Sequence, residues 1–265
     1  MTLRGDRESV DILVFGPHPD DVELGCGATL ALMAAIGRTF GICDLTRGEM
    51  GTRGTPDLRA GEARRAADIL GARFRETLDL GDGNLRTDRS AELAVIDVVR
   101  RRRPRIVLAP WREDRHPDHP RAHRLVSDAA WYAGLRALKT GVPPHRPQQV
   151  VYYPASYEFG RPPSFLVDVT ETFEQKLEAI RAYTSQFFRG RPRERGTFVS
   201  SKGFFDGIAA RARSFGRIAN VAYAEGFISS LPPRLSDVVA AFEGYETDVS
   251  RTKPERPPRR RQKAR

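Results

Sequence analysis

Short apolar runs alternate with longer segments of helical spacing along the first half of the chain. Apolar runs that end in glycine or proline are typical of buried parallel strands, and the amphipathic segments between them indicate helices. The strand-like runs lie at residues 11–15, 39–46, 74–80 and 105–109, and the helical segments at residues 24–36, 62–70 and 91–103. This alternation predicts the α/β fold class, as a single Rossmann-like domain whose mostly parallel sheet has helices on both faces.

The second half of the chain continues with the same kinds of element in a less regular order. Helical patterns cover residues 120–135, 171–187, 204–219 and 236–245, and strand patterns cover residues 149–153, 165–169 and 222–228. A chain of 265 residues suits one large domain. We therefore expect an N-terminal extension at residues 1–9, the domain at residues 10–245 and a basic tail at residues 246–265.

Local signals predict where several of the helices end. Gly71 is placed to close the helix at residues 62–70, and Ser90 is placed to cap the helix at residues 91–103. Pro104 then stops that helix before the next strand.

Histidines and aspartates follow two of the predicted strands. His18, Asp20 and Asp21 come directly after the first strand, and His116 and His119 follow the strand that ends near Pro110. In an open α/β sheet, ligands bind in the crevice outside the carboxyl ends of the strands. Imidazole and carboxylate groups are the ligands that Zn²⁺ uses in catalytic sites. An isolated loop histidine is usually just solvated, but two such clusters at strand ends together predict a metal site.

The glycines after the first metal loop do not indicate a dinucleotide site. The segment Gly25-Cys26-Gly27-Ala28-Thr29-Leu30 lacks the third glycine of the dinucleotide fingerprint. Carboxylates also occupy the turn where a pyrophosphate would need bare backbone amides. We therefore exclude a nicotinamide or flavin cofactor bound in this way.

Charge is concentrated at the C-terminal end. Residues 251–265 hold eight lysines and arginines against one glutamate, so most of the chain's net charge of +10 lies there. A proline-rich, like-charged run without apolar residues predicts a disordered tail. Such a tail leaves open a non-specific contact with nucleic acid, and an RNA-binding protein is the alternative from a different functional class.

The remaining composition predicts a soluble intracellular protein. No apolar run approaches the 18 or so residues of a membrane span, and residues 1–9 lack an apolar signal core, so we expect a cytoplasmic location. Cys26 and Cys43 lie inside apolar elements and are too few for a disulfide framework, so we expect both to be reduced.

The two metal loops carry a family resemblance. Pro17-His18-Pro19-Asp20-Asp21-Val22-Glu23 and His116-Pro117-Asp118-His119 resemble the signature of the PIG-L/LmbE family of zinc-dependent N-acetylglucosamine deacetylases. The similarity runs from about residue 10 to residue 229. Residues 44–55, 113–119 and 223–227 are most similar to the bacillithiol-biosynthesis branch, the N-acetylglucosaminyl-malate deacetylases. The resemblance implies a zinc-dependent hydrolase that removes the acetyl group from N-acetylglucosaminyl-malate.

The resemblance also implies a metal shell. It places one Zn²⁺, or another divalent metal, on His18, Asp21 and His119, which form the two-histidine, one-carboxylate shell that the residue types suggest. Asp20 is then free to act as the general base. His123 lies one helical turn after His119, and we expect it to be an outer or surface residue.

The second loop supplies further candidates. His116 is expected to face the acetyl carbonyl and to stabilise the oxyanion when protonated. Asp118 either holds that imidazole charged or stabilises the turn as a loop carboxylate. We therefore name Asp20, His116 and Asp118 as catalytic candidates.

A glycine-rich loop at residues 47–58 has the form of a binding loop. We expect Arg53 to read a malate carboxylate through a bidentate guanidinium contact. Glu49 in the same loop and Arg112 beside the second metal loop are further substrate-binding candidates.

Several alternatives remain open. Other family substrates are the inositol conjugate of mycothiol synthesis and oligosaccharides.

A metallophosphoesterase would also use histidines and aspartates at strand ends, but it usually needs two metals and more ligands than the sequence offers. Members resembling this chain commonly self-associate, so a homo-oligomer is expected, with a small amino-sugar conjugate as substrate.

Overall fold

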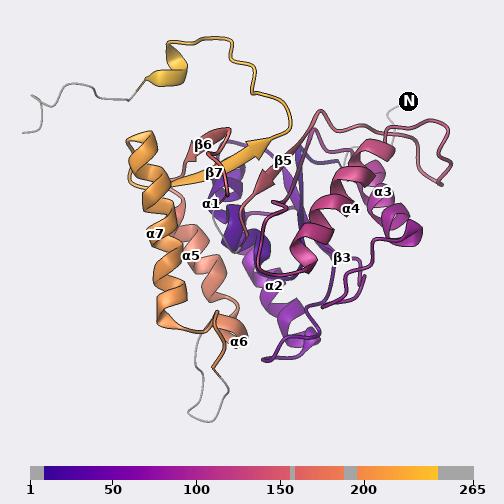
Figure 1. The fold of residues 1–265 in the computed structure, drawn as a ribbon, viewed down its shortest axis with the longest axis horizontal. Coiled ribbons are helices and arrows are strands. Elements are labelled where there is room, and N and C mark those ends of the chain that lie inside the picture. The colour runs from indigo at the N-terminus through magenta and orange to yellow at the C-terminus, as the bar shows by residue number, and fades with distance from the viewer. Residues whose placement is uncertain (1–8, 156–158, 188–195, 244–265) are drawn as a thin grey trace, which may run out of the picture. The chain divides into compact units, whose positions relative to one another are not determined.

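The computed structural model describes residues 9–155, 159–187 and 196–243, and these residues build one sheet covered by helices (Figure 1). Within them the sheet has seven strands in the order β3-β2-β1-β4-β5-β7-β6. The strands are β1 Ile12–Gly16, β2 Phe40–Asp44, β3 Arg75–Thr77, β4 Ile106–Pro110, β5 Gln149–Tyr153, β6 Phe165–Asp168 and β7 Ala224–Ser229. The helices are α1 Asp21–Ala35, α2 Pro56–Leu70, α3 Arg89–Arg102, α4 Asp118–Tyr132, α5 Phe173–Arg181, α6 Thr184–Phe187 and α7 Lys202–Ala219.

The sheet is mostly parallel, as the alternating pattern predicts. β1 pairs in parallel with β2 and β4, β2 with β3, and β4 with β5. Only β7 runs against its neighbours β5 and β6 among the described strands. The chain first winds outward from β1 to β3 and then returns to β4 on the other side of β1. This reversal creates a crevice at the carboxyl ends of β1 and β4, which is where open α/β sheets bind ligands.

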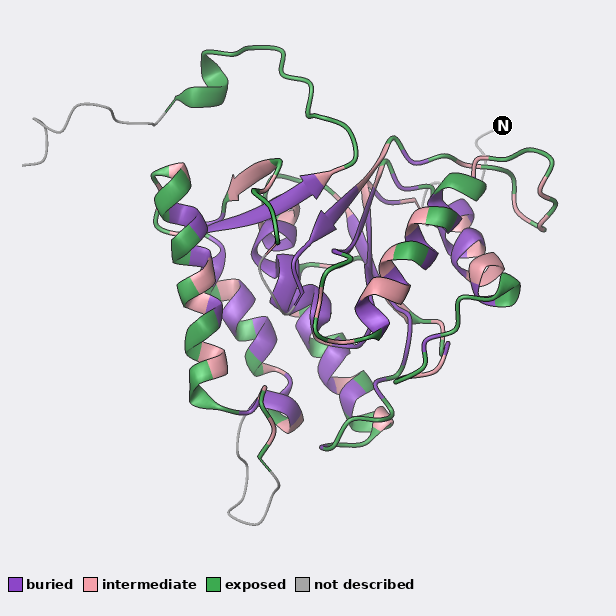
Figure 2. Ribbon diagram, in the orientation of Figure 1, coloured by how far each residue is buried: buried purple, intermediate pink, exposed green. Residues whose placement is uncertain are grey.

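Two apolar cores lie on the two faces of the sheet. Successive residues of β1 alternate between them: Val14 packs with α1, α2, α5 and α7, whereas Leu13 and Phe15 pack with α3 and α4. The central strands β1, β2 and β4 are accordingly buried between two layers of helices, whereas the edge strands β3 and β6 are only partly buried (Figure 2). Helices on both faces are what the sequence predicts, because a strand buried on both sides has no polar face.

Some element ends differ from the sequence prediction. Asp88, rather than Ser90, caps α3, because its carboxylate accepts a hydrogen bond from Ala91 N at 2.9 Å while the Ser90 hydroxyl donates to the same carboxylate. The single helix expected at residues 171–187 is two helices, α5 and α6. The described part of the helix expected at residues 236–245 contains only a 3₁₀ turn at Ala240–Phe242, and residues 244–245 lie outside the described residues.

The chain divides into a compact unit, Met1–Arg234, and a short separate unit, Leu235–Arg265. The predicted tail at residues 246–265 lies outside the described residues. Cys26 and Cys43 are both buried and unpaired, as expected. None of the described helices is long and apolar enough to cross a bilayer.

Helix α1 is broken, and residues from α5 and β7 hold the break together. Cys26 has non-helical dihedral angles (φ −144°, ψ 18°). The Glu225 carboxylate accepts hydrogen bonds from Ala28 N at 3.3 Å and Thr29 N at 2.8 Å, so it caps the second half of the helix. Lys176 Nζ donates to Leu24 O at 2.9 Å and pairs with Glu225 at 2.6 Å. The buried ion pair therefore satisfies backbone groups that the break exposes.

The break brings two glycines of α1 into different surroundings, which allows a matched stability test. A Cβ at Gly25 would overlap the Tyr153 ring, whereas a Cβ at Gly27 would meet its nearest neighbour, Lys176 Cγ, at an ordinary 3.4 Å. We predict that Gly25→Ala lowers the free energy of unfolding by about 1 to 3 kcal/mol through overpacking. Gly27→Ala should be neutral or stabilising by up to about 1 kcal/mol, since alanine favours helix. Urea denaturation measures both, and equal effects of the two changes would contradict this packing.

Candidate metal centre

Three imidazole rings meet at the crevice between β1 and β4. His18 follows β1, His116 lies just before α4, and His119 lies in the first turn of α4. The ring centroids are 4.6 Å apart for His18 and His116, 5.3 Å for His116 and His119, and 5.7 Å for His18 and His119. One nitrogen of each ring lies within 4.8 Å of the others, which is close enough for a shared metal ion.

Asp21 joins two of these rings. Its Oδ2 lies 3.0 Å from His18 Nδ1 and 3.3 Å from His119 Nε2, and it also accepts a hydrogen bond from His18 N at 2.9 Å. Asp21 is buried in the first turn of α1, directly after the metal loop. The structure therefore brings together His18, Asp21 and His119, the three residues that the resemblance places around a metal.

Two further aspartates approach the same histidines, and the sequence reasoning did not single them out. Asp82 Oδ1 lies 3.0 Å from His18 Nε2, and Asp114 Oδ2 lies 3.1 Å from His119 Nδ1. With Asp118, His18 and Asp82 form a second group whose ligand atoms lie within 4.8 Å. The available signal was position: Asp82 is in the loop after β3, at the same edge of the sheet as the two metal loops.

Asp118 stabilises a loop and does not pair with His116 through its carboxylate. Its Oδ2 accepts a hydrogen bond from Gly83 N at 2.8 Å and lies 3.4 Å from His18 Nε2, while its Oδ1 accepts from Leu85 N at 3.0 Å. Arg121 donates to the same Oδ1 at 3.0 Å. Of the two roles that the sequence left open, the geometry favours the turn carboxylate, because these contacts already engage both oxygens.

His116 receives its hydrogen bond from the backbone instead. Asp118 N donates to His116 Nδ1 at 3.3 Å, which leaves the ring proton on Nε2. Burial, together with the charges of His18 and His119, lowers the pKa of His116. In the metal-free protein a third charge beside His18 and His119 is disfavoured, and the expected role of His116 at the acetyl carbonyl stays a prediction.

The other two histidines are held in the charged state. Burial opposes the charge on His119, but Asp21 and Asp114 outweigh it and raise the pKa to about 9. Burial likewise opposes the charge on His18, and its hydrogen bonds to Asp118, Asp21 and Asp82 raise its pKa well above the usual value. Two protons thus neutralise buried carboxylates in the metal-free protein.

This charge balance fits a bound cation. Metal ligands must be deprotonated, so a divalent ion would replace the protons on His18 and His119 while keeping the carboxylates neutralised. Its donor set would be two imidazoles and the Asp21 carboxylate, which is a set suited to a catalytic divalent metal.

Asp20 stands beside these ligands in an unusual backbone conformation. Its φ is 112°, a region that non-glycine residues rarely enter and in which aspartate and asparagine are enriched. Burial raises the pKa of Asp20 to about 7, while Arg59 opposes the shift. A carboxyl group with such a pKa exchanges protons readily at neutral pH.

Arg59 is a second residue that the sequence reasoning missed. Its buried guanidinium donates to Pro19 O at 2.6 Å, to Gly48 O at 2.8 Å and to Asp20 Oδ2 at 3.2 Å. It therefore ties the metal loop to the glycine-rich loop. Arg59 belongs to α2, far from both histidine motifs in sequence, so no local pattern marked it.

A cavity of about 400 Å³ opens over these residues. His18, Asp20, Asp21, His116 and His119 line its floor, together with Arg59 and Asp82. Its remaining wall is partly apolar, from Met50, Phe198 and Phe204, and Arg115 lies over the Phe198 ring at 4.6 Å from the centroid. A small organic molecule would fit this volume.

The three substrate-binding candidates lie outside the cavity lining. Arg53 is 8% exposed, and its Nη1 donates to Gln186 O at 3.4 Å. Glu49 accepts hydrogen bonds from Arg47 N and Asp82 N, so it holds the loops together. The exposed Arg112 lies over the Trp111 ring at 5.0 Å. Two of these partners, Gln186 and Asp82, are distant along the chain from the residues that they contact, so the local sequence does not indicate them.

The chain is similar in sequence to proteins that are named as deacetylases. Residues 13–130 match the family model described as PIG-L, GlcNAc-PI de-N-acetylase. The diacetylchitobiose deacetylase of Thermococcus kodakarensis is 35% identical over 191 residues, which cover 66% of this chain and 70% of that protein. The probable N-acetyl-alpha-D-glucosaminyl L-malate deacetylase 2 of Bacillus anthracis is 29% identical over 66% of this chain and 81% of that protein.

Two further matches cover more of the chain. The crystal structure of the conserved protein TT1542 from Thermus thermophilus is 42% identical, with a TM-score of 0.77, over 85% of this chain and 97% of that one. The 4-oxalmesaconate hydratase of Pseudomonas putida is 29% identical over 86% of this chain and 92% of that protein. The same chain architecture therefore occurs in proteins named for different reactions.

The raised pKa of His119 predicts how pH and metal together affect stability. The pKa rises from 6.5 to about 9 on folding, so the charged ring stabilises the metal-free fold below pH 6.5 and this stabilisation is lost as pH rises through about 9. We expect the melting temperature of the metal-free protein to fall over this window, and added Zn²⁺ to reverse the fall. The slope should be shallower in His119→Gln. A melting temperature that is independent of pH in the metal-free protein would contradict this linkage.

Proposed function

The chain belongs to the PIG-L family of de-N-acetylases, and from that premise we propose that it is a metal-dependent hydrolase that removes the acetyl group from an N-acetylglucosaminyl conjugate. One observation carries the proposal. Asp20, whose pKa is about 7, lines the same cavity as His18, Asp21 and His119. A proton acceptor therefore stands beside a group of metal ligands, which is the arrangement that metal-assisted amide hydrolysis needs.

We place one Zn²⁺ on His18, Asp21 and His119. When bound, zinc makes water a nucleophile near neutral pH and polarises the acetyl carbonyl. The protein's own contribution is to position these donors: Asp21 Oδ2 already lies within 3.3 Å of a nitrogen of each ring in the metal-free protein, and Asp114 orients His119 from the other side.

Asp20 is the proposed general base. It takes a proton from the attacking water and later delivers a proton to the nitrogen of the leaving amine as the amide C–N bond breaks, which yields acetate and the free amino sugar. Arg59 holds the Asp20 carboxylate and the preceding Pro19 carbonyl, so the base cannot swing out of the cavity. Arg59 is in this way a positioning residue.

His116 is the proposed donor to the acetyl oxygen. Since Asp118 N occupies Nδ1, the Nε2–H is free to donate into the cavity that His116 lines. A neutral imidazole aimed at the developing oxyanion stabilises the transition state without first losing a proton.

The partly apolar wall of the cavity supports a conjugate rather than free N-acetylglucosamine. Phe198 and Met50 offer apolar surface, and Arg115 offers a cation at the same opening. A malate aglycone would use the cation, and the similarity to the Bacillus anthracis protein supports it. A second sugar ring would use the aromatic surface, and the higher identity to the diacetylchitobiose deacetylase supports that substrate. We retain N-acetylglucosaminyl-malate as the first candidate, and an inositol conjugate or oligosaccharide as alternatives.

A hydratase is the second candidate function, since the match to the 4-oxalmesaconate hydratase extends over 92% of that protein. Such an enzyme would use the same floor of the cavity to add water across a carbon–carbon double bond. Self-association and a contact of the basic tail with nucleic acid both stay predictions from the sequence.

A substrate panel separates these functions. We expect the metal-loaded protein to release acetate from N-acetylglucosaminyl-malate, and free N-acetylglucosamine to be a poorer substrate by at least about tenfold, because it cannot reach Arg115 or Phe198. Faster release from diacetylchitobiose would make the oligosaccharide the preferred class. Hydration of 4-oxalmesaconate without any acetate release would overturn the deacetylase proposal.

Two substitutions separate metal binding from chemistry. Asp20→Asn keeps the size of the side chain and tolerates the positive φ, but it cannot accept a proton. We expect it to keep the metal while kcat falls by about 10² to 10⁴. His119→Ala should lose the metal and the activity together. Metal analysis beside steady-state kinetics makes the distinction, and loss of metal from Asp20→Asn would show that Asp20 is a ligand instead.

A further inference from the structure

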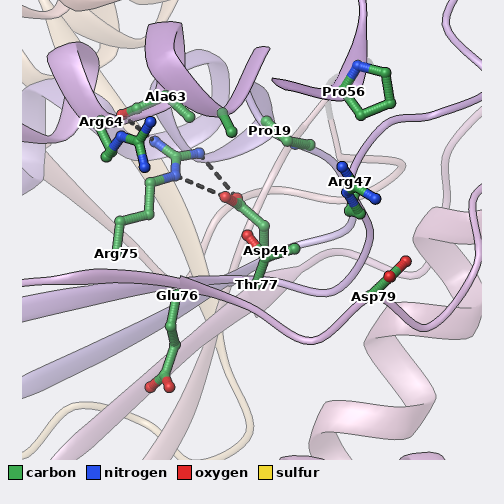
Figure 3. Close-up of a pocket in the computed structure, with 11 residues that line it drawn as sticks. Pro19, Asp44, Arg47, Pro56, Ala63, Arg64, Arg75, Glu76, Thr77 and Asp79 are labelled. Atoms are coloured by element: carbon green, nitrogen blue, oxygen red, sulfur yellow. Dashed lines mark hydrogen bonds and ion pairs between the residues drawn. The ribbon is translucent and has the colours of Figure 1, made fainter. Parts of the chain in front are cut away.

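A second cavity lies on the other side of the metal loop. It has a volume of about 390 Å³ and opens between α2 and the carboxyl ends of β2 and β3 (Figure 3). Pro19 lines this cavity, whereas its neighbours His18 and Asp20 line the metal cavity. The two cavities therefore share a wall but hold different residues, and the proposed hydrolysis uses none of the side chains of the second one.

Arginines from three separate elements line the second cavity. Arg47 follows β2, Arg64 belongs to α2 and Arg75 belongs to β3. Figure 3 shows the guanidinium groups of Arg64 and Arg75 at one end and that of Arg47 at the other, with Asp44 between them. A concave surface with cations at both ends is a surface that would attract an anion.

The acidic side chains of this cavity cancel part of that charge, but two of its three arginines, Arg47 and Arg64, form no pair with them in the described part of the chain. Asp44 is neutralised by Arg75, which contacts its two oxygens at 2.7 Å and 2.8 Å. Glu76 points away from the other labelled side chains (Figure 3) and pairs with Arg101 and Arg102 at 3.3 Å and 3.1 Å. Asp79 remains as the single carboxylate lining the cavity that has no cationic partner among the described residues.

Two cations remain available to a ligand. Within the described residues Arg64 has no hydrogen-bond or ion-pair partner, although it is exposed. In the part of the chain that the structure describes, Arg47 pairs only with Asp57, whose side chain is 94% exposed. An exposed pair of this kind contributes little free energy, so a ligand anion can displace it. Pro56 at the start of α2 also lines the cavity, and the helix dipole adds a partial positive charge there.

We propose that this second cavity binds a small organic dianion, with one acidic group at Arg64 and the other at Arg47. The volume suits a molecule of metabolite size. Two separated cations match two acidic groups better than they match one, which favours a dicarboxylate over acetate or inorganic phosphate. Thr77, whose side chain also lines the cavity, supplies a hydroxyl for an additional hydrogen bond.

The occupant would be in contact with the metal loop through two routes. Pro19 forms part of the wall, and Arg75 pairs at 2.5 Å with Glu23, which lies in the first turn of α1 directly after the metal loop. Tyr183 donates to the same Glu23 oxygen at 3.1 Å, so the pair is held in place. Binding in the second cavity would therefore change the conformation of the metal loop, which makes the second cavity a regulatory site for the reaction in the metal cavity.

Titration calorimetry on the intact, metal-loaded protein tests the site, with succinate, acetate and inorganic phosphate as probes. We expect saturable binding of succinate that is tighter than that of acetate or phosphate. Arg64→Gln should weaken succinate by about tenfold to a hundredfold, as expected for a lost charge-assisted contact. Arg65→Gln is the matched control, because Arg65 is the next residue of α2 and is exposed but does not line the cavity.

The metal cavity is itself able to attract anions, and one variant separates the two sites. Asp20→Asn changes the metal cavity alone, so it should leave the succinate dissociation constant unchanged. A change in Asp20→Asn with none in Arg64→Gln would move the anion to the metal cavity and overturn the proposal. Absence of saturable succinate binding, or equal losses in Arg64→Gln and Arg65→Gln, would overturn it too. Any effect of succinate on kcat should disappear in Arg64→Gln, whose kcat without succinate should match that of the unmodified protein.

Discussion

The constraint on which this structure depends is the concentration of negative charge at one edge of its sheet. Asp20, Asp21, Asp82, Asp114 and Asp118 all contact or adjoin the three imidazoles between β1 and β4. Carboxylates so close together cannot all be ionised unless cations share the space. The fold supplies histidine protons for this purpose in the absence of metal, and each proton sits on an atom suited to bind a metal. The same aspartates and histidines therefore determine both the stability of the metal-free fold and the binding of a metal.

Buried arginines neutralise carboxylates and bind loop carbonyls around the centre. Arg59 spans the metal loop and the glycine-rich loop, and Arg75 joins Glu23 of the metal loop to Asp44 at the end of β2. Arg53 and Gln186 bind each other's backbone, since Gln186 Nε2 also donates to Arg53 O at 2.8 Å. A guanidinium group has several donors in a fixed plane, so one side chain can fix several loop carbonyls at once. Loops without secondary structure become rigid enough to position catalytic groups.

The sequence predicted what depends on local pattern and missed what depends on distant partners. The alternation of strands and helices led to the parallel sheet, and the two histidine motifs led to His18, Asp21 and His119, which the structure places in contact. Arg59 and Asp82 were missed because nothing near them in sequence is distinctive. The glycine-rich loop predicts that Arg53 contacts a substrate, which stays a prediction, but the pattern does not indicate its contact with Gln186, which is distant in sequence. The antiparallel pairing of β7 was likewise beyond the apolar pattern, since that pattern carries no strand direction.

The broken helix α1 makes the metal centre depend on residues that are distant from it along the chain. Every residue of the centre lies between His18 and His119, so that segment looks like a self-contained module. Part of the support of α1, the helix that begins at Asp21, comes from the far part of the chain: Lys176 donates to Leu24 O, and Glu225 caps the second half of the helix. The ligands and part of their scaffold are thus encoded in different halves. A fragment that ends after His119 would contain every residue of the metal centre but would lack the contacts from Lys176 and Glu225. A chimeric chain would therefore keep the geometry of the centre only if both halves came from the same parent.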